Sequence, residues 1–135
     1  MNNPLLIRRE AEVLILSNNN VAARNALSPE FYAAVTTALV QAAEDSSIGA
    51  IILTGEGGHF CAGGDLRQLA KRRELPVQER REKLEGLHHL IRAVRDCPKP
   101  VIAAVEAQPQ VRGCRWRWPA TCWWRPRTAC FRWPM

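Results

Sequence analysis

The sequence predicts an α/β fold, because short apolar runs typical of strands are separated by longer amphipathic segments typical of helices. The runs 50–54 and 101–105 are continuous and bounded by turn residues, as expected of buried strands covered on both faces. Helical patterns precede the first of these runs and lie between the two. The expected order is β-β-α-β-α-β, and 135 residues that are 47% apolar suffice for one soluble domain.

The N-terminal part should form a hairpin followed by a helix. Two apolar runs, 5–7 and 13–16, flank a charged segment, which is typical of paired strands joined by a polar turn. Ser28 is a favoured N-cap, Pro29 suits the first helical position, and Glu30 is an early acid, so a helix should begin here and end near 45–47. Its predicted apolar stripe consists of Phe31, Val35, Ala38, Leu39 and Ala42.

The second helical pattern is bounded by glycine on one side and proline on the other. Glu56-Gly57-Gly58 should end the strand at 50–54, and a highly charged stretch, 71–74, follows as a solvated helix face. Pro98 and Pro100 should stop the helix ahead of the last strand. The side of this helix predicted to face inward carries Leu84, Leu87, Ile91 and Val94.

A glycine-rich segment, 59–66, lies where a buried strand passes into a helix. Gly63 and Gly64 allow positive φ and a close approach of a ligand to the backbone, and Asp65 is placed to cap the following helix. Backbone N–H groups at such a helix start favour negative charge. Taken alone, two glycines before a helix are more often a simple turn than a binding site.

Four segments in order change this interpretation: 24–27 (Arg-Asn-Ala-Leu), 50–55 (Ala-Ile-Ile-Leu-Thr-Gly), 60–66 (Phe-Cys-Ala-Gly-Gly-Asp-Leu) and 99–106 (Lys-Pro-Val-Ile-Ala-Ala-Val-Glu). Together they resemble successive landmarks of the enoyl-CoA hydratase/isomerase (crotonase) family. The resemblance implies an α/β crotonase-like spiral of β-β-α units, truncated. It divides the chain into 1–106, the N-terminal part of an acyl-CoA-binding domain, and 107–135, a non-homologous tail.

The resemblance also implies a site that binds an acyl-CoA thioester and stabilises its enolate through an oxyanion hole. Gly64 would supply one of two backbone N–H donors. No metal is expected, and no cofactor beyond the coenzyme A carried by the substrate. The intact parent would be a homotrimer or hexamer. The residues expected to contact acyl-CoA are Ala22, Ala23, Arg24, Ala62, Gly63, Asp65 and Leu66.

Other conspicuous residues have plainer interpretations. Cys61 is expected to be a small buried residue, and His88 and His89 to lie on the surface without metal partners. No apolar run approaches membrane-spanning length and no secretory leader is evident, so we expect a cytoplasmic protein without a membrane partner. Five cysteines, an odd number, indicate reduced thiols.

The tail departs from the family pattern. It holds all five tryptophans, six of the 19 Lys/Arg residues and none of the 13 acids, so the net charge of +6 belongs to it. One alternative is a binding module that engages nucleic acid or a protein partner through Arg and Trp. A metal site at Cys114, Cys122 and Cys130 fits no zinc spacing. Both alternatives rest on composition alone, and no nucleic-acid partner is predicted.

A shifted reading frame accounts for the tail's composition better. Suppose that one G was lost from the run of G that encodes Glu106 and a following Gly. The last base of each later codon then joins the first two bases of the next codon. Read in this way, Trp118 and Pro119 encode Ala, and Cys122 and Trp123 encode Leu. The hidden frame then begins close to Gly-Ala-Ala-Ala-Gly-Ala-Gly, the loop that supplies the second donor in the family. It would also put serine where hydratases carry their first catalytic glutamate. The chain itself is therefore expected to be an inactive fragment, and the parent a hydratase or an isomerase.

Overall fold

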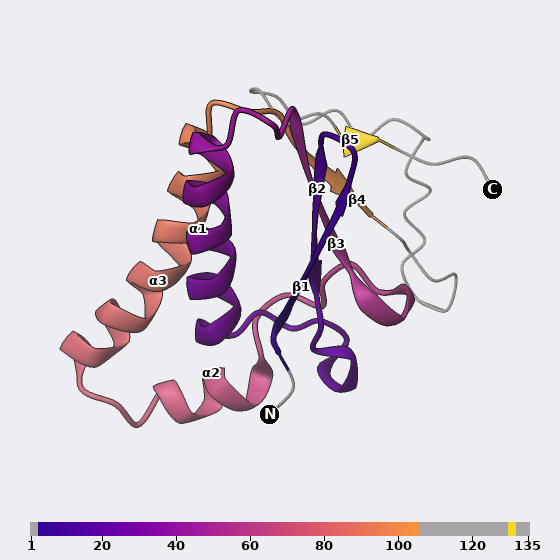
Figure 1. The fold of residues 1–135 in the computed structure, drawn as a ribbon. Helices are drawn as coiled ribbons and strands as arrows, with labels where there is room; N and C mark the ends of the chain where they lie inside the picture. Colours follow the sequence, from indigo (N-terminus) through magenta and orange to yellow (C-terminus); the bar gives the residue numbers. More distant parts are fainter. Residues whose placement is uncertain (1–2, 106–129, 132–135) are drawn as a thin grey trace.

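A computed structural model describes residues 3–105 and the backbone of residues 130–131. The predictions for the tail 107–135, namely the shifted frame, the nucleic-acid module and the cysteine site, lie outside the described residues apart from the backbone of 130–131. The described part has the element order β1-β2-α1-β3-α2-α3-β4-β5, with two short 3₁₀ turns (Figure 1). The expected order β-β-α-β-α-β is confirmed, except that two helices rather than one separate the last two predicted strands.

The strands form one mixed sheet in chain order. β1 (Leu5–Glu10) and β2 (Val13–Asn18) make the predicted antiparallel hairpin, with Leu5 opposite Asn18. β3 (Ala50–Gly55) is parallel to β2, and β4 (Val101–Ala104) is parallel to β3. The two-residue β5 (Cys130–Phe131) adds to the edge of β4, also in parallel. Because β2, β3 and β4 are parallel, the loops that leave them meet at one edge of the sheet.

Helix α1 (Pro29–Glu44) lies against one face of the sheet, and α3 (Val77–Asp96) packs alongside α1 (Figure 1). The predicted start of α1 is confirmed: Ser28 accepts a hydrogen bond from the Phe31 N–H at 3.3 Å, and Pro29 occupies the first turn. The short helix α2 (Leu66–Arg72) follows the glycine-rich segment. The fold therefore places α2 at the edge of the sheet where the parallel strands end (Figure 1).

The hydrophobic core lies between α1 and the sheet. Every second residue of a strand points to this face, so Leu14 and Leu16 of β2 are buried together with Ile51 of β3. Burying a side chain of this size contributes about 1.5–3 kcal/mol. The predicted cover on both faces of β3 is only partly found, because Ile51 is fully buried and the other five residues of the strand are half-buried.

Both predicted helix stripes need correction. In α1 the first buried position is Tyr32, while Phe31 is only partly buried. In α3 the buried residue is Leu90, whereas Leu84 and Ile91 are 44% and 56% exposed. The spacing 87, 90, 94 satisfies helical periodicity as well as 84, 87, 91 does, so periodicity alone cannot choose between them. The choice is made by the packing of α3 against α1.

Candidate functional site

The predicted site residues lie on two loops that leave neighbouring parallel strands. The first loop runs from the end of β2 to the start of α1, and the second from the end of β3 to the start of α2. Both leave the carboxyl ends of their strands, which is where open α/β sheets generally bind ligands. The structure thus brings together two groups of residues that are about 40 positions apart in the sequence.

The first loop contains the 3₁₀ turn Val21–Ala23 and two residues in the left-handed region, Arg24 (φ 51°) and Asn25 (φ 58°). The side chains of Ala22 and Arg24 are exposed and Ala23 is half-buried. This turn therefore presents short side chains and one cation to solvent. Such a surface can accommodate the phosphates and nucleotide of coenzyme A, as the resemblance implies.

The second loop contains several glycines with a left-handed backbone. Gly57 (φ 71°), Gly58 (φ 74°) and Gly63 (φ 88°) all adopt the left-handed region, where residues with a Cβ are strained. Gly64, by contrast, does not, so the prediction of positive φ holds for the first glycine of that pair. Ala62 and Gly64 are exposed, and Gly63 is half-buried.

Hydrogen bonds hold the two loops together. The Leu27 N–H donates to the carbonyl oxygen of Gly63 at 2.8 Å, and an isolated parallel bridge joins Leu27 to Gly64. The buried side chain of Asn25 donates through Nδ2 to the carbonyl oxygens of Glu56 (2.8 Å) and His59. The backbone around Gly64 is therefore fixed from both ends of the second loop.

The start of α2 confirms the predicted cap. The Asp65 carboxylate accepts a hydrogen bond from the Arg67 N–H at 2.9 Å, which satisfies one of the free donors of the first turn. Within the described residues, the backbone N–H of Gly64 has no acceptor. Among the described side chains, a Cβ at Gly64 would meet the flexible Leu69 alone, at 3.3 Å, a tight contact that Leu69 can relieve by a small shift. The donor predicted from the family pattern thus lies on an exposed, uncrowded stretch of backbone.

Cys61 and the two histidines contact residues of their own loop and helix. Cys61 is half-buried rather than buried, and its Sγ accepts from the Gly63 N–H at 3.2 Å. On α3, His89 is exposed as predicted and His88 is half-buried, and each lies within 4 Å of the Glu85 carboxylate. In the described part of the chain, no cluster of three metal-ligating side chains occurs. Likewise, none of the described helices is long and apolar enough to cross a membrane.

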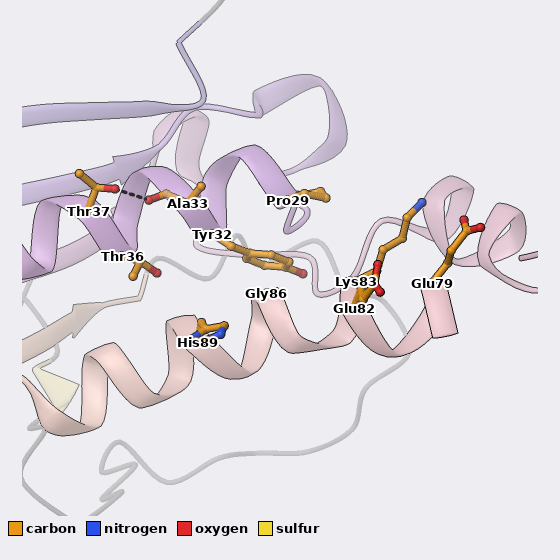
Figure 2. A pocket seen from close by; sticks show the side chains of 10 residues that line it. All are labelled: Pro29, Tyr32, Ala33, Thr36, Thr37, Glu79, Glu82, Lys83, Gly86 and His89. Carbon is orange, nitrogen blue, oxygen red and sulfur yellow. Dashed lines mark hydrogen bonds between the residues drawn. The ribbon is translucent and has the colours of Figure 1, made fainter. Parts of the chain in front are cut away.

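A cavity of about 550 Å³ lies elsewhere, between α1 and α3 (Figure 2). The ring of Tyr32 extends from α1 toward Gly86 of α3, where the missing side chain leaves room for it (Figure 2). Burial raises the pKa of Tyr32 above its ordinary value, and the nearby Arg72 guanidinium of α2 opposes that shift. Of the predicted acyl-CoA contacts whose side chains the structure describes, none lines this cavity. It is lined by Pro29, Tyr32, Ala33, Thr36, Thr37, Glu79, Glu82, Lys83, Gly86 and His89.

After an opening hairpin, the loops that leave the parallel strands β2 and β3 lead into helices at one sheet edge, and the second of these loops is rich in glycine, as at the start of a crotonase-like spiral. Comparison with known proteins agrees. The enoyl-CoA hydratase/isomerase family model matches residues 8–116, which include every predicted site residue and the first part of the predicted tail. The chain belongs to the enoyl-CoA hydratase/isomerase family.

Similar proteins include hydratases and an isomerase. The chain is 38% identical over 111 residues to an enoyl-CoA hydratase of Mycobacterium tuberculosis, covering 80% of this chain and 40% of that protein. It is 32% identical over 105 residues to the peroxisomal Delta(3,5)-Delta(2,4)-dienoyl-CoA isomerase of Arabidopsis thaliana, covering 71% and 38%. An enoyl-CoA hydratase structure from Polaromonas sp. superimposes with a TM-score of 0.74 at 44% identity, covering 76% and 40%. The chain thus spans about 40% of the length of these relatives.

Sequence reasoning missed the residues that join the two loops. Asn18 and Asn25 are fully buried, and the Asn18 Nδ2 donates to the Asn25 carbonyl oxygen at 2.9 Å. The sequence has three consecutive asparagines at 18–20, directly after the second apolar run, and a further one at 25. A signal was available, because asparagine is the residue other than glycine that most readily adopts the left-handed region and bonds to nearby backbone.

Proposed function

We propose that this chain provides the acyl-CoA-binding half of an enzyme that transforms acyl-CoA thioesters, with the Gly64 N–H as one donor of an oxyanion hole. The observation that carries the proposal is the juxtaposition of the two loops through the Leu27 to Gly63 hydrogen bond of 2.8 Å. One loop presents Ala22, Ala23 and Arg24 for the coenzyme A moiety. The other presents Ala62, Gly63 and Gly64 to the thioester, with Asp65 and Leu66 beside the acyl chain.

The chemistry requires fixed donors. When a proton leaves the carbon next to a thioester, negative charge moves onto the thioester oxygen and forms an enolate. Backbone N–H groups held in place before the reaction stabilise that charge without reorganisation, and loss of one such donor typically costs about 3–4 kcal/mol of barrier. Helix α2 has only seven residues, so we assign the stabilisation mainly to the Gly64 N–H itself and only in small part to the helix dipole.

The proposal assigns this chain binding rather than turnover. A second oxyanion donor and the catalytic carboxylates are not identified in its sequence, so we expect no hydratase or isomerase activity from the chain by itself. The complete protein would act on acyl-CoA in the cytoplasm as a homotrimer or hexamer, with no cofactor beyond substrate-borne coenzyme A and no nucleic-acid partner. The comparisons lend no support to the nucleic-acid alternative, and we do not propose it.

Binding of an unreactive thioester tests the proposal. Butyryl-CoA should bind the purified chain more tightly than free coenzyme A, because only the thioester oxygen can accept from Gly64; one net hydrogen bond corresponds to roughly a 5- to 10-fold ratio of Kd. Gly64→Pro removes the N–H and should bring the ratio of the two Kd values close to 1. Gly64→Ala keeps the N–H and should preserve it, since its Cβ meets only Leu69.

Three outcomes oppose the proposal. They are equal binding of the two ligands by the unchanged chain, an undiminished ratio in Gly64→Pro, and binding that depends on residues 107–135 instead of the two loops. A salt-dependent affinity for single-stranded nucleic acid that is lost with the tail would favour the alternative module. Sequencing the source DNA across the codons for 105–108 tests the shifted frame separately, since one additional G should restore the glycine- and alanine-rich loop.

A further inference from the structure

We infer that Asn25 is a positioning residue for the oxyanion donor: its buried side chain fixes the Gly63–Gly64 segment relative to the loop that faces coenzyme A. The inference rests on the proposed function, in which Gly64 carries the donor. Asn25 is buried and its side chain bonds to the backbone of Glu56, His59 and Asn20, so it has no direct part in the proposed chemistry.

The Asn25 carboxamide spans both loops. Its side chain is 0% exposed, so every polar atom must find a partner inside the protein. The Nδ2 group donates to the carbonyl oxygens of Glu56 at 2.8 Å and of His59, both in the second loop. The Oδ1 atom accepts from the Asn20 N–H at 3.1 Å, in the first loop. The donor half of the amide therefore holds one loop, and the acceptor half holds the other.

Two backbone features make room for this arrangement. Asn25 lies at φ 58°, a conformation that asparagine adopts more readily than other residues with a side chain apart from aspartate. A Cβ at Gly55 would lie 2.5 Å from the Asn25 Nδ2 and 2.7 Å from the Phe60 carbonyl oxygen. The amide of Asn25 therefore lies against the bare backbone at the end of β3, and only glycine at position 55 permits that approach.

Asn25 and Leu27 attach the second loop at two points, and Gly64 directly follows the second of them. Asn25 fixes the start of the second loop at Glu56 and His59, and two residues after Asn25 the Leu27 N–H fixes its end at Gly63. Loss of the amide would free the first of these two attachments. A donor displaced by about 1 Å can cost roughly 100-fold in rate even when the change is remote from the reacting atoms. Asn25 would thus act on the thioester only through the position of the Gly64 N–H.

Three substitutions isolate the role of the amide. Asn25→Gly removes the amide yet tolerates the left-handed backbone, so backbone strain does not obscure the result. Asn25→Asp keeps the oxygen that accepts from Asn20 but loses both N–H donors to the second loop. Asn19→Gly is the matched control, because within the described part of the chain the Asn19 side-chain amide, in the same loop, bonds to the Asn3 carbonyl oxygen alone, at 3.0 Å.

The first measurement is hydrogen exchange of single backbone amides, which needs no ligand. In Asn25→Gly and Asn25→Asp, exchange of the Leu27 amide should accelerate by at least 10-fold. Exchange of the Ile51 amide, which bonds to the Pro100 carbonyl oxygen at 2.9 Å inside the sheet, should stay within 2-fold. Asn19→Gly should change neither. Unchanged exchange at Leu27 in the Asn25 variants, or equal acceleration at Leu27 and Ile51, would overturn the inference in favour of no role or general destabilisation.

The second measurement is the Kd ratio of coenzyme A to butyryl-CoA. Both Asn25 variants should bring this ratio close to 1, and Asn19→Gly should retain the value of the unchanged chain. A ratio that survives in Asn25→Gly contradicts the inference even if exchange at Leu27 has accelerated. If the unchanged chain shows no preference for butyryl-CoA, the proposed function fails, and the exchange of Leu27 alone then decides whether Asn25 holds the segment.

Discussion

Gly55 should be far less tolerant of alanine than its counterpart at the other end of β3, Gly49. A Cβ at Gly55 would lie 2.5 Å from the Asn25 Nδ2, 2.7 Å from the Phe60 carbonyl oxygen and closer still to the His59 carbonyl oxygen. Two of these neighbours are backbone atoms, so the second loop must move away from the strand. At Gly49 the nearest atom is the Glu12 Oε2 at 3.4 Å, an ordinary van der Waals distance.

The expected cost of Gly55→Ala is about 3–5 kcal/mol. Overpacking of a well-filled site costs about 1–3 kcal/mol, and displacement of the loop breaks two hydrogen bonds of Asn25 that contribute about 1 kcal/mol each. Against a typical domain stability of about 5–15 kcal/mol, this is a large fraction. Gly49→Ala should stay within about 0.5 kcal/mol of the unchanged chain, as substitutions at open surface positions usually do.

Urea unfolding followed by circular dichroism at low micromolar concentration measures both variants. The midpoint should fall sharply for Gly55→Ala and hardly at all for Gly49→Ala. If the midpoint of Gly55→Ala lies within error of that of Gly49→Ala, the close approach of Asn25 to Gly55 is not part of the folded structure. Asn25 would then not hold the two loops together at the end of β3.

Other parts of the fold give four further predictions. Tyr32 is the only tyrosine, so tyrosinate absorbance reports its titration alone. Because burial raises the pKa of Tyr32, the hydroxyl of the folded chain should titrate above pH 10, and the titration should shift down to about pH 10 in denaturant. Because the folded pKa exceeds the unfolded pKa, stability should decline as pH rises between the two, and a Tyr32→Phe variant should lack that part of the decline. Leu90→Ala should lower the free energy of unfolding in urea by about 2–5 kcal/mol, and Ile91→Ala by less than about 1 kcal/mol, because Leu90 is 9% exposed and Ile91 is 56% exposed. Equal losses would contradict the observed buried stripe of α3. Asp65→Ala should cost about 1 kcal/mol through loss of the cap, and Asp65→Asn much less; similar losses would show that the charge matters more than the hydrogen bond. The isolated chain should aggregate when it is concentrated, because apolar side chains such as Ile7 and Ile91 are each 56% exposed; a chain that stays monomeric at high concentration by analytical ultracentrifugation would oppose this.

Local features of the structure could be predicted from the sequence because their causes are local. Ser28 and Pro29 start α1 through contacts within one turn, and Asp65 caps α2 in the same way. The apolar runs became strands, and Cys97 ends α3 as the proline after it requires. The residues expected at the site also followed from a local pattern, whose family is confirmed, although their individual roles stay predictions.

Only the tertiary structure decided which residues face which, because that depends on partners distant in the sequence. Periodicity allowed either Leu90 or Ile91 to face inward on α3, and packing against α1 selected Leu90. The same holds for Asn25, whose partners Glu56 and His59 lie more than 30 residues away. An asparagine after a strand indicates a turn in any sequence, and it becomes a connection between two loops only when the parallel pairing of β2 and β3 brings them to one edge.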